Sequence, residues 1–149
     1  MGSALEALAP VLAEFPTAEA PLTPGDASAV ARLTSAVERV AAPDLEGAMI
    51  GPDPSFRIEF DGANGMIERW SDWLSPYESF RMEIGDLIES GDVLVTCARQ
   101  FGTPTGGGPE VEAESAAVWW LRDDRLVRVE FHLDREAALR AAGLDSADP

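Results

Sequence analysis

The chain has 149 residues and a formal net charge of −16, with 11 Arg, no Lys, one Cys and one His. A single Cys excludes an intramolecular disulfide and a Cys-rich zinc site, and without Lys there is no Schiff-base or phosphate-loop lysine. His132 alone cannot form a multi-histidine metal site. We therefore expect no metal and no cofactor, and the acidic charge with its scattered Arg residues disfavours nucleic acid as a partner.

The N-terminal residues show no convincing targeting signal. The moderately apolar stretch 4–15 contains Glu6 and Glu14, follows no basic segment and is too short to span a bilayer. We therefore expect a cytoplasmic protein with no membrane contact.

Apolar residues at spacings of three and four predict two amphipathic helices in the first third of the chain. The first covers 4–15, and the proline-rich stretch 16–25 predicts an extended linker after it. Asp26 is a candidate N-cap for the second helix, which ends before Pro43.

The central part predicts two short strands and a third helix. A strand followed by a loop is expected within 44–54, a second strand over 56–60, and a helix over 64–74. Trp70 and Trp73 lie on the wide apolar face of this helix. Aromatic residues at helical spacing are more often core than ligand contacts, so we expect this face to be buried.

The last part predicts an antiparallel meander and a final helix. Alternating apolar residues indicate strands at about 80–84, 92–103, 110–121 and 126–133. Asp123 and Asp124 form a two-residue turn between the last two strands. Asp134 caps a helix over 135–142, which Gly143 ends.

Helices first, then antiparallel strands with one helix inserted and one at the end, predict an α+β fold. The length is that of one domain. We divide the chain into an N-terminal helix and linker (1–25), the main domain (26–144) and a short C-terminal tail (145–149).

Three segments carry a family resemblance: GANGMIERWSDWL, YESFRMEIGDLIESGDVLV and VWWLRDDRLVRVEFHLDREAALRAAGL. They lie within residues 61–144, somewhat over half of the chain, and the last segment is the most specific. They resemble the SnoaL-like branch of the nuclear-transport-factor-two-like superfamily. The N-terminal third fits in outline only, because the proline-rich linker interrupts the family's usual helix pair.

The resemblance implies a cone-shaped fold in which a curved, mainly antiparallel sheet wraps around N-terminal helices and encloses an apolar cavity. Homodimers are common in the superfamily. Its members include ketosteroid isomerases, limonene epoxide hydrolases, polyketide cyclases and noncatalytic binding proteins, so the fold does not define the activity.

Strand parity predicts which residues face the cavity. With a two-residue turn, residues on the last two strands pair when their numbers sum to 247. The more apolar face then includes Trp120, Val129 and Phe131, which we predict as ligand-binding residues together with Trp70. The same parity places His132 on the outer face, unless the turn has a third residue.

Two charged residues are the candidate catalytic pair. Parity points Glu114 toward the cavity, and Arg99 is in phase on the preceding strand. Glu114, or Glu112 two residues earlier, could be a general base, with Arg99 stabilising an oxyanion. An internal ion pair, or a solvated position at the rim, is the alternative for Glu114 and Arg99.

The known enzymes of the superfamily fit poorly. A ketosteroid isomerase needs an Asp base on the early strand, where this chain has Gly47-Ala48-Met49, and an epoxide hydrolase needs an Asp at the position of Phe131. We therefore prefer a domain that binds a small hydrophobic molecule and forms a homodimer. A cyclase, isomerase or hydrolase using acid/base catalysis is the alternative, and a protein-interaction module is the third hypothesis.

Overall fold

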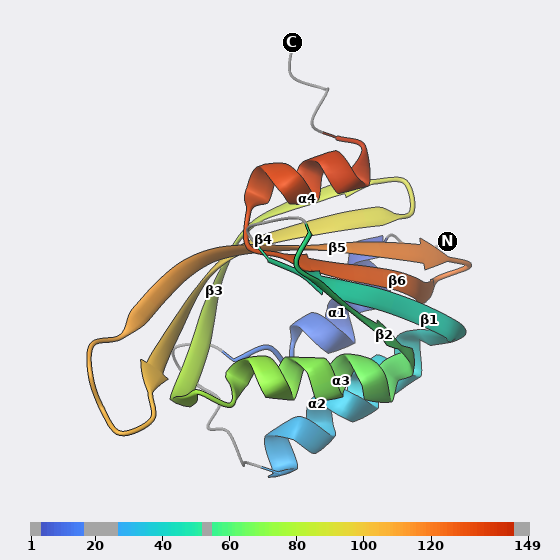
Figure 1. The fold of residues 1–149 in the computed structure, drawn as a ribbon. Helices are drawn as coiled ribbons and strands as arrows, with labels where there is room; N and C mark the ends of the chain where they lie inside the picture. The colour runs from blue at the N-terminus through green and yellow to red at the C-terminus, as the bar shows by residue number, and fades with distance from the viewer. Residues whose placement is uncertain (1–3, 17–26, 52–54, 145–149) are drawn as a thin grey trace.

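The computed structural model describes residues 4–16, 27–51 and 55–144. Within these residues the chain forms four helices and one six-stranded sheet (Figure 1). In chain order the elements are α1 (Ala4–Leu12), α2 (Ala27–Val40), β1 (Ala41–Ile50), β2 (Arg57–Asp61), α3 (Gly62–Leu74), β3 (Tyr77–Ser90), β4 (Val93–Pro104), β5 (Val111–Arg122), β6 (Arg125–His132) and α4 (Arg135–Ala142). The predicted α+β fold is confirmed.

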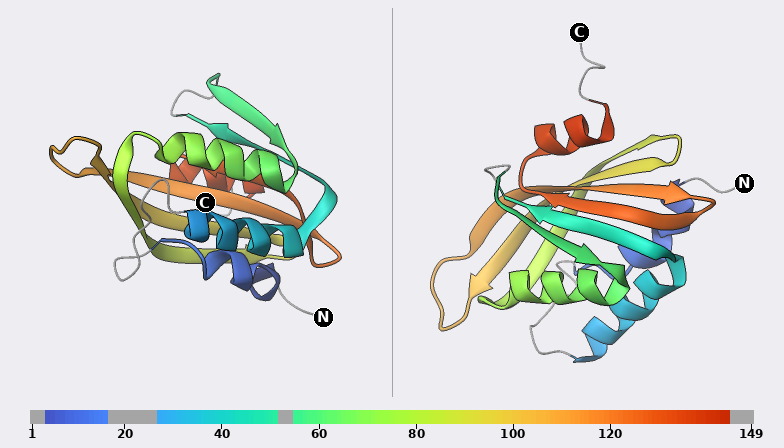
Figure 2. Two further views of the ribbon diagram at one scale, coloured as in Figure 1. Left: turned by 90° about the horizontal axis from the view of Figure 1, so that it is seen from below. Right: turned by 45° about the vertical axis from the view of Figure 1, so that its right-hand side comes forward.

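The sheet is open and mostly antiparallel, with the strand order β2-β1-β6-β5-β4-β3. Only the pairing of β1 with β6 is parallel among the strands that the structure describes. Helices α1, α2 and α3 cover one face of the curved sheet, which we call the inner face, and α4 lies on the opposite, outer face (Figures 1 and 2).

The main core lies between the three helices and the inner face. Leu8 and Val11 of α1 are fully buried in it, as is Val37 of α2. Helix α1 therefore belongs to the same core as the rest of the domain, although we grouped it with the linker. The predicted linker after Pro16, the Asp26 cap and the 145–149 tail lie outside the described residues.

The turn between β5 and β6 has the two residues predicted. Asp123 and Asp124 have φ angles of 54° and 64°, as a type I′ hairpin turn requires. Arg122 pairs with Arg125, and their numbers sum to 247 as expected.

The predicted register is wrong beyond that first part of the hairpin. A β-bulge shifts the pairing from Leu121–Leu126 to Trp120–Arg128, so Val127 is an extra residue on β6. Phe131 therefore pairs with Ala117, where parity without a bulge had predicted Ala116. A shift of one residue changes which side chains of the two strands share a face.

Helix α4 forms as the sequence predicts. Asp134 accepts a hydrogen bond from the backbone N–H of Glu136, and Gly143 ends the helix in the left-handed conformation with φ 78°. Ala138 of α4 is fully buried against Val95 and Val118 of the sheet. This second cluster covers part of the outer face.

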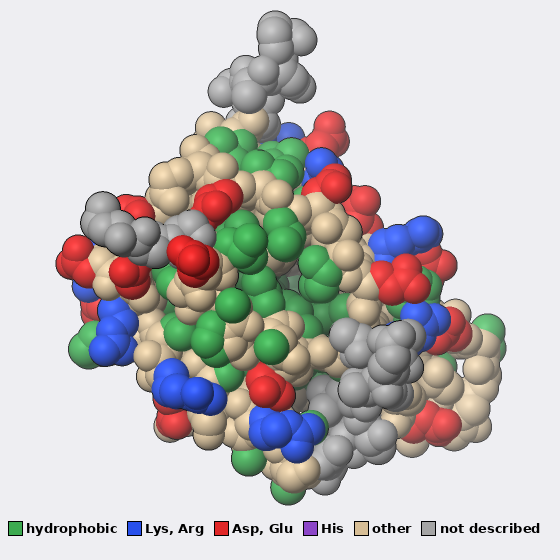
Figure 3. All heavy atoms as spheres, turned by 180° about the vertical axis from the view of Figure 1, so that it is seen from behind, with side chains coloured by type: hydrophobic (Ala, Val, Ile, Leu, Met, Phe, Trp, Pro, Cys, Tyr) green, Lys and Arg blue, Asp and Glu red, His purple; other side chains and the backbone are tan. Residues whose placement is uncertain are grey.

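Basic side chains on the surface in Figure 3 lie singly or beside acidic ones, and hydrophobic side chains gather in its middle. Two ion pairs join residues far apart in the chain, Arg122 with Asp44 at 3.1 Å and Arg135 with Asp86 at 2.6 Å. Across the described ranges, no helix is both long and apolar enough to cross a bilayer.

Candidate functional site

A pocket of about 230 Å³ lies between α3 and the inner face of the sheet. All six strands contribute to it, as do α3 and the segments before β2 and after α1. Its larger apolar lining residues are Phe15, Met49, Ile50, Phe56, Ile58, Trp70, Trp73, Met82, Phe131 and Leu133. The lining is therefore largely aromatic and aliphatic.

Phe15 connects the pocket to the aromatic core. Its ring stacks against Trp70 of α3 with centroids 6.4 Å apart and lies 6.1 Å from the ring of Trp119 on β5. The backbone next to it is fixed to the sheet edge, because the carbonyl of Pro16 accepts a hydrogen bond from Met82 of β3. The segment after α1 thus forms part of the pocket wall.

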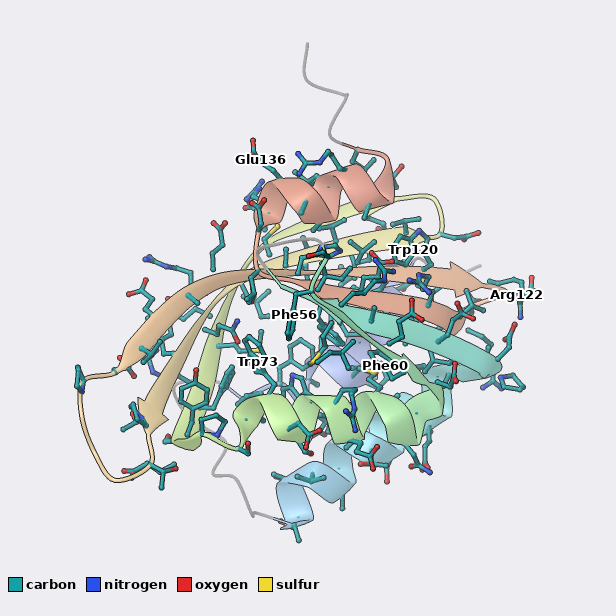
Figure 4. All side chains as sticks on the ribbon, viewed as in Figure 1. Phe56, Phe60, Trp73, Trp120, Arg122 and Glu136 are labelled. Carbon is teal, nitrogen blue, oxygen red and sulfur yellow. The ribbon has the colours of Figure 1, made fainter. Side chains whose placement is uncertain are left out.

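Three lining residues are exposed apolar side chains. Phe56, Ile58 and Trp73 are 58%, 39% and 36% exposed. Figure 4 shows Trp73 projecting from α3 toward the sheet and Phe56 projecting from the segment before β2 toward α3. Because exposed aromatic rings are unfavourable in water, a hydrophobic molecule entering here would cover them.

Most of the polar lining groups already have partners. Trp119 Nε1 donates to Thr96 Oγ1 at 3.1 Å, and Trp73 Nε1 donates to Gln100 Oε1 at 3.4 Å. Arg69 forms an ion pair with Asp72 at 3.4 Å. These side chains are held in position by the protein itself.

His132 borders the pocket at the end of β6 and is 6% exposed. The register places its side chain on the outer face, as parity predicted, together with Glu130 and Arg128. Its Nε2 lies 3.1 Å from Oε1 of Glu130, whose Oε2 accepts hydrogen bonds from Arg128 Nε and Nη2 at 3.0 and 2.6 Å. Arg57 Nη2 lies 3.6 Å from the same Oε2. A buried carboxylate is thus surrounded by one imidazole and two guanidinium groups.

This arrangement determines the charge of Glu130. The hydrogen bond from His132, together with those from Arg128, lowers the pKa of Glu130 to about 2, although burial acts in the opposite direction. Glu130 is therefore an ionised hydrogen-bond acceptor at neutral pH.

Of the predicted ligand-binding residues, Trp70 and Phe131 line the pocket, and Val129 and Trp120 do not. Val129 is fully buried in the main core. Trp120 packs in the cluster beneath α4, on the outer face (Figure 4). The physical reason is the bulge at Val127, because it places Trp119 of β5, not Trp120, on the same face as Phe131.

The predicted catalytic pair lies outside this pocket. Arg99 and Glu114 are opposite each other on β4 and β5, and both are exposed. Arg99 forms an ion pair with Glu112, and these side chains line a shallow surface hollow. The reason is the face of the sheet: Arg99 is in phase with Cys97 of the outer-face cluster, and Glu114 with Ala116 of the same cluster. Ala98 and Ser115, one residue away on each strand, are the ones that line the pocket.

Sequence reasoning missed Phe15, Met49 and Phe56 as lining residues. Phe15 continues the apolar spacing of the first helix, and this was the available signal for it. Phe56 begins the apolar alternation that continues with Ile58 and Phe60, but its part in the pocket depends on the pairing of β1 with β2 and on the position of α3. Among the described residues, no group of three His, Cys, Asp or Glu side chains could hold a metal ion.

A family model of the SnoaL-like domain matches residues 5–129, most of the chain. The chain belongs to the SnoaL-like family. The resemblance seen in the sequence is therefore confirmed, and the SnoaL-like match includes α1 as well as the strands. No curated protein matches this chain.

Solved structures share the fold of this SnoaL-like domain. An NTF2-like protein from Burkholderia thailandensis E264 superimposes with a TM-score of 0.66 at 18% identity, over 100% of each chain. TerC co-crystallised with polyporic acid gives 0.62 at 17% identity, over 96% of this chain and 98% of that one. A putative SnoaL-like polyketide cyclase from Jannaschia sp. CCS1 superimposes with a TM-score of 0.58 at 15% sequence identity, over 78% of this chain and 81% of that one. These identities establish a shared fold only.

Proposed function

We propose that this SnoaL-like domain binds a small hydrophobic molecule in the pocket between α3 and the inner face of the sheet. The observation that carries the proposal is the combination of an aromatic lining with the exposed rings of Phe56 and Trp73 beside it. Ligand pockets in proteins are typically lined by apolar and aromatic side chains with a few polar groups.

The pocket volume of about 230 Å³ lies below the usual lower limit of about 300 Å³ for ligand pockets. A compact molecule of one or two rings is therefore the expected ligand. The structural neighbour that was co-crystallised with polyporic acid supports a ligand-binding role for this fold.

A homodimer is part of the same proposal, and light scattering on the purified protein tests it.

A thermal-shift screen tests the proposal. The panel contains steroids, polyketide aromatics, terpene epoxides and fatty acids, together with two-ring aromatics. A ligand at about 100 times its Kd stabilises the native state by about 2.7 kcal/mol, which gives a visible shift in Tm. A panel without any shift would contradict the proposal.

A matched pair of variants locates the binding. Ala98 lines the pocket, so Ala98→Leu fills it and should abolish the ligand-induced shift. Ala113 lies on the paired strand outside this pocket, and Ala113→Leu should leave the shift unchanged. Equal shifts in the two variants would place the ligand elsewhere.

Acid/base catalysis is the second candidate, and one observation favours it. His132 borders the pocket at the end of β6, and its Nε2 is hydrogen-bonded to a carboxylate, which is how proteins orient a histidine that transfers protons. A compound found by the screen should then be converted by the wild type and not by His132→Gln. Unchanged compound after incubation with the wild type supports binding alone.

A further inference from the structure

Gln100 and Ser115 are two polar residues of the pocket lining that keep unused hydrogen-bonding groups. Both side chains are half-buried on the inner face of the sheet. Within the described ranges, neither Gln100 Nε2 nor Ser115 Oγ has a hydrogen-bond partner. Neither atom is fully buried, so each keeps surface that a molecule in the pocket can contact.

The strand register brings these two side chains close together. Ser115 of β5 pairs with Ala98 of β4, which also lines the pocket. Gln100 follows Ala98 by two residues and points to the same face. Gln100 and Ser115 are therefore diagonal neighbours on adjacent strands, at about 7–8 Å, a separation that a long side chain bridges. One ligand atom between them can contact both.

Trp73 determines which end of the Gln100 amide is free. Its Nε1 donates to Gln100 Oε1 at 3.4 Å, and an indole N–H can only donate. The amide oxygen therefore faces Trp73, and the NH₂ group is the free end. An NH₂ group also only donates, whereas the hydroxyl of Ser115 donates or accepts. The pocket thus offers a pair of hydrogen-bond donors at this end of the sheet.

We infer that Gln100 and Ser115 together bind a carbonyl oxygen of the ligand, and that the ligand is a compact, uncharged aromatic ketone. The inference rests on the proposed function, because it requires a molecule in the pocket. A carbonyl oxygen has two lone pairs and accepts from both donors at once. Met82, Trp70 and Phe131 contact the apolar remainder of the molecule.

The charges around the pocket favour a ketone over a carboxylate. Arg69 is the one arginine in the described lining, and it is paired with Glu68 at 3.0 Å and with Asp72 at 3.4 Å. The net charge of −16 also repels an anion. A carboxylate would lose its hydration here without gaining a cation, whereas a neutral carbonyl accepts the same two hydrogen bonds.

Two compounds of nearly the same shape test the inference. 2-Acetylnaphthalene is a ketone, and in 2-isopropenylnaphthalene a CH₂ group replaces the ketone oxygen. Isothermal titration of the wild type should give a Kd for the ketone that is about tenfold lower, because the alkene leaves both donors unpaired. In Gln100→Leu this preference should disappear, because the carbonyl is then buried without its main donor.

Two serine variants form a matched pair. Ser115→Ala removes the second donor and should reduce the preference for the ketone to about threefold, the size of one modest hydrogen bond. Ser90 lies at the end of β3, outside the pocket lining, so Ser90→Ala should keep the preference of the wild type. A full preference in Ser115→Ala would show that the hydroxyl of Ser115 does not bind the ligand.

The outcomes separate the inference from the proposed function. If both compounds bind the wild type with equal Kd values, the pocket binds hydrophobic molecules and the donor role of Gln100 is overturned. If neither compound binds, the inference and the proposed function both fail. A preference for the ketone that persists in Gln100→Leu also overturns the inference, because another group must then donate to the carbonyl.

Proton NMR gives a second readout that needs no variant. The chain has one Gln and one Asn, so its two side-chain NH₂ groups are readily assigned. Bound 2-acetylnaphthalene should move the Gln100 NH₂ protons to lower field than the bound alkene does. Asn64 of α3 does not line the pocket, and its NH₂ protons should be the same with both compounds. Gln100 signals that do not differ between the two bound compounds overturn the inference.

Discussion

Arg128 binds the carboxylate of Glu130 through two nitrogens, with Nη2 2.6 Å and Nε 3.0 Å from Oε2. Both residues lie on β6, two positions apart, so they point to the same face of the sheet. Arg128 also forms an ion pair with Glu46 at 2.9 Å. Glu46 lies on β1, the strand that pairs in parallel with β6, so the ion pair links these two strands. Glu130 is thus the centre of a charged cluster that fixes the orientation of His132.

Removing the charge of Glu130 should destabilise the fold. Its pKa is about 2 in the folded protein, against an ordinary value of 4.5. A shift of this size corresponds to about 3 kcal/mol of stability at neutral pH. We expect Glu130→Gln to lower the free energy of unfolding by this order, measured by urea denaturation at pH 7.

The pH dependence of that loss has a defined sign. Because folding lowers the pKa of Glu130, its contribution to stability is complete above about pH 4.5 and is lost as the pH falls toward 2. The difference between the wild type and Glu130→Gln should therefore shrink from pH 6 to pH 3. A difference that stays constant over this range would show that Glu130 is not held as an ionised group.

Gly47 should tolerate no side chain. A Cβ atom there would lie 2.1 Å from the carbonyl oxygen of Val129 and 2.7 Å from the ring of Phe60. We expect Gly47→Ala to lower the free energy of unfolding by about 3 kcal/mol, because the strands β1 and β6 would have to separate. Gly85→Ala is the matched control, since its Cβ would meet only the carbonyl oxygen of Cys97 at 3.5 Å. If urea denaturation showed the same decrease in the free energy of unfolding for both variants, this account would be contradicted.

The turn between β5 and β6 can be improved. Asp124 has a φ of 64°, which is unfavourable for a residue with a side chain and free of strain for glycine. Asp124→Gly should raise the stability by about 1 kcal/mol and the Tm by about 3 °C. Asp124→Ala removes the same charge but keeps a Cβ, so it should give no increase. A rise in both variants would indicate a charge effect instead.

Periodicity and capping were sufficient to predict most of the elements. Helix α4 begins and ends as predicted because Asp134 and Gly143 mark its two ends through local hydrogen bonds and backbone conformation. The strand predicted at 80–84 is in fact Tyr77–Ser90, because it continues through an irregularity between Ile84 and Leu87. Local patterns predict an element's type better than its ends, since pairing with a neighbour determines how far a strand extends.

The pocket could be predicted only in part. Phe131 and Trp70 follow from apolar alternation and helical spacing, and both line it. Trp120 was assigned to the wrong face because no local signal marks Val127 as a bulge residue. Glu114 was assigned to the cavity through the same register error, because it is in phase with Ala116 and Val118 of the outer face, where it is exposed.

The four tryptophans allow the central claim to be measured in one experiment. In ¹H–¹⁵N spectra each indole N–H gives its own signal. Trp70 and Trp73 line the pocket, whereas Trp120 lies beneath α4 on the outer face. Titration with 2-methoxynaphthalene, or with the best compound from the screen, should move the Trp70 and Trp73 signals in a saturable manner and leave Trp120 in place. No movement at saturating ligand, or movement of Trp120 without Trp70 and Trp73, would contradict binding in this pocket.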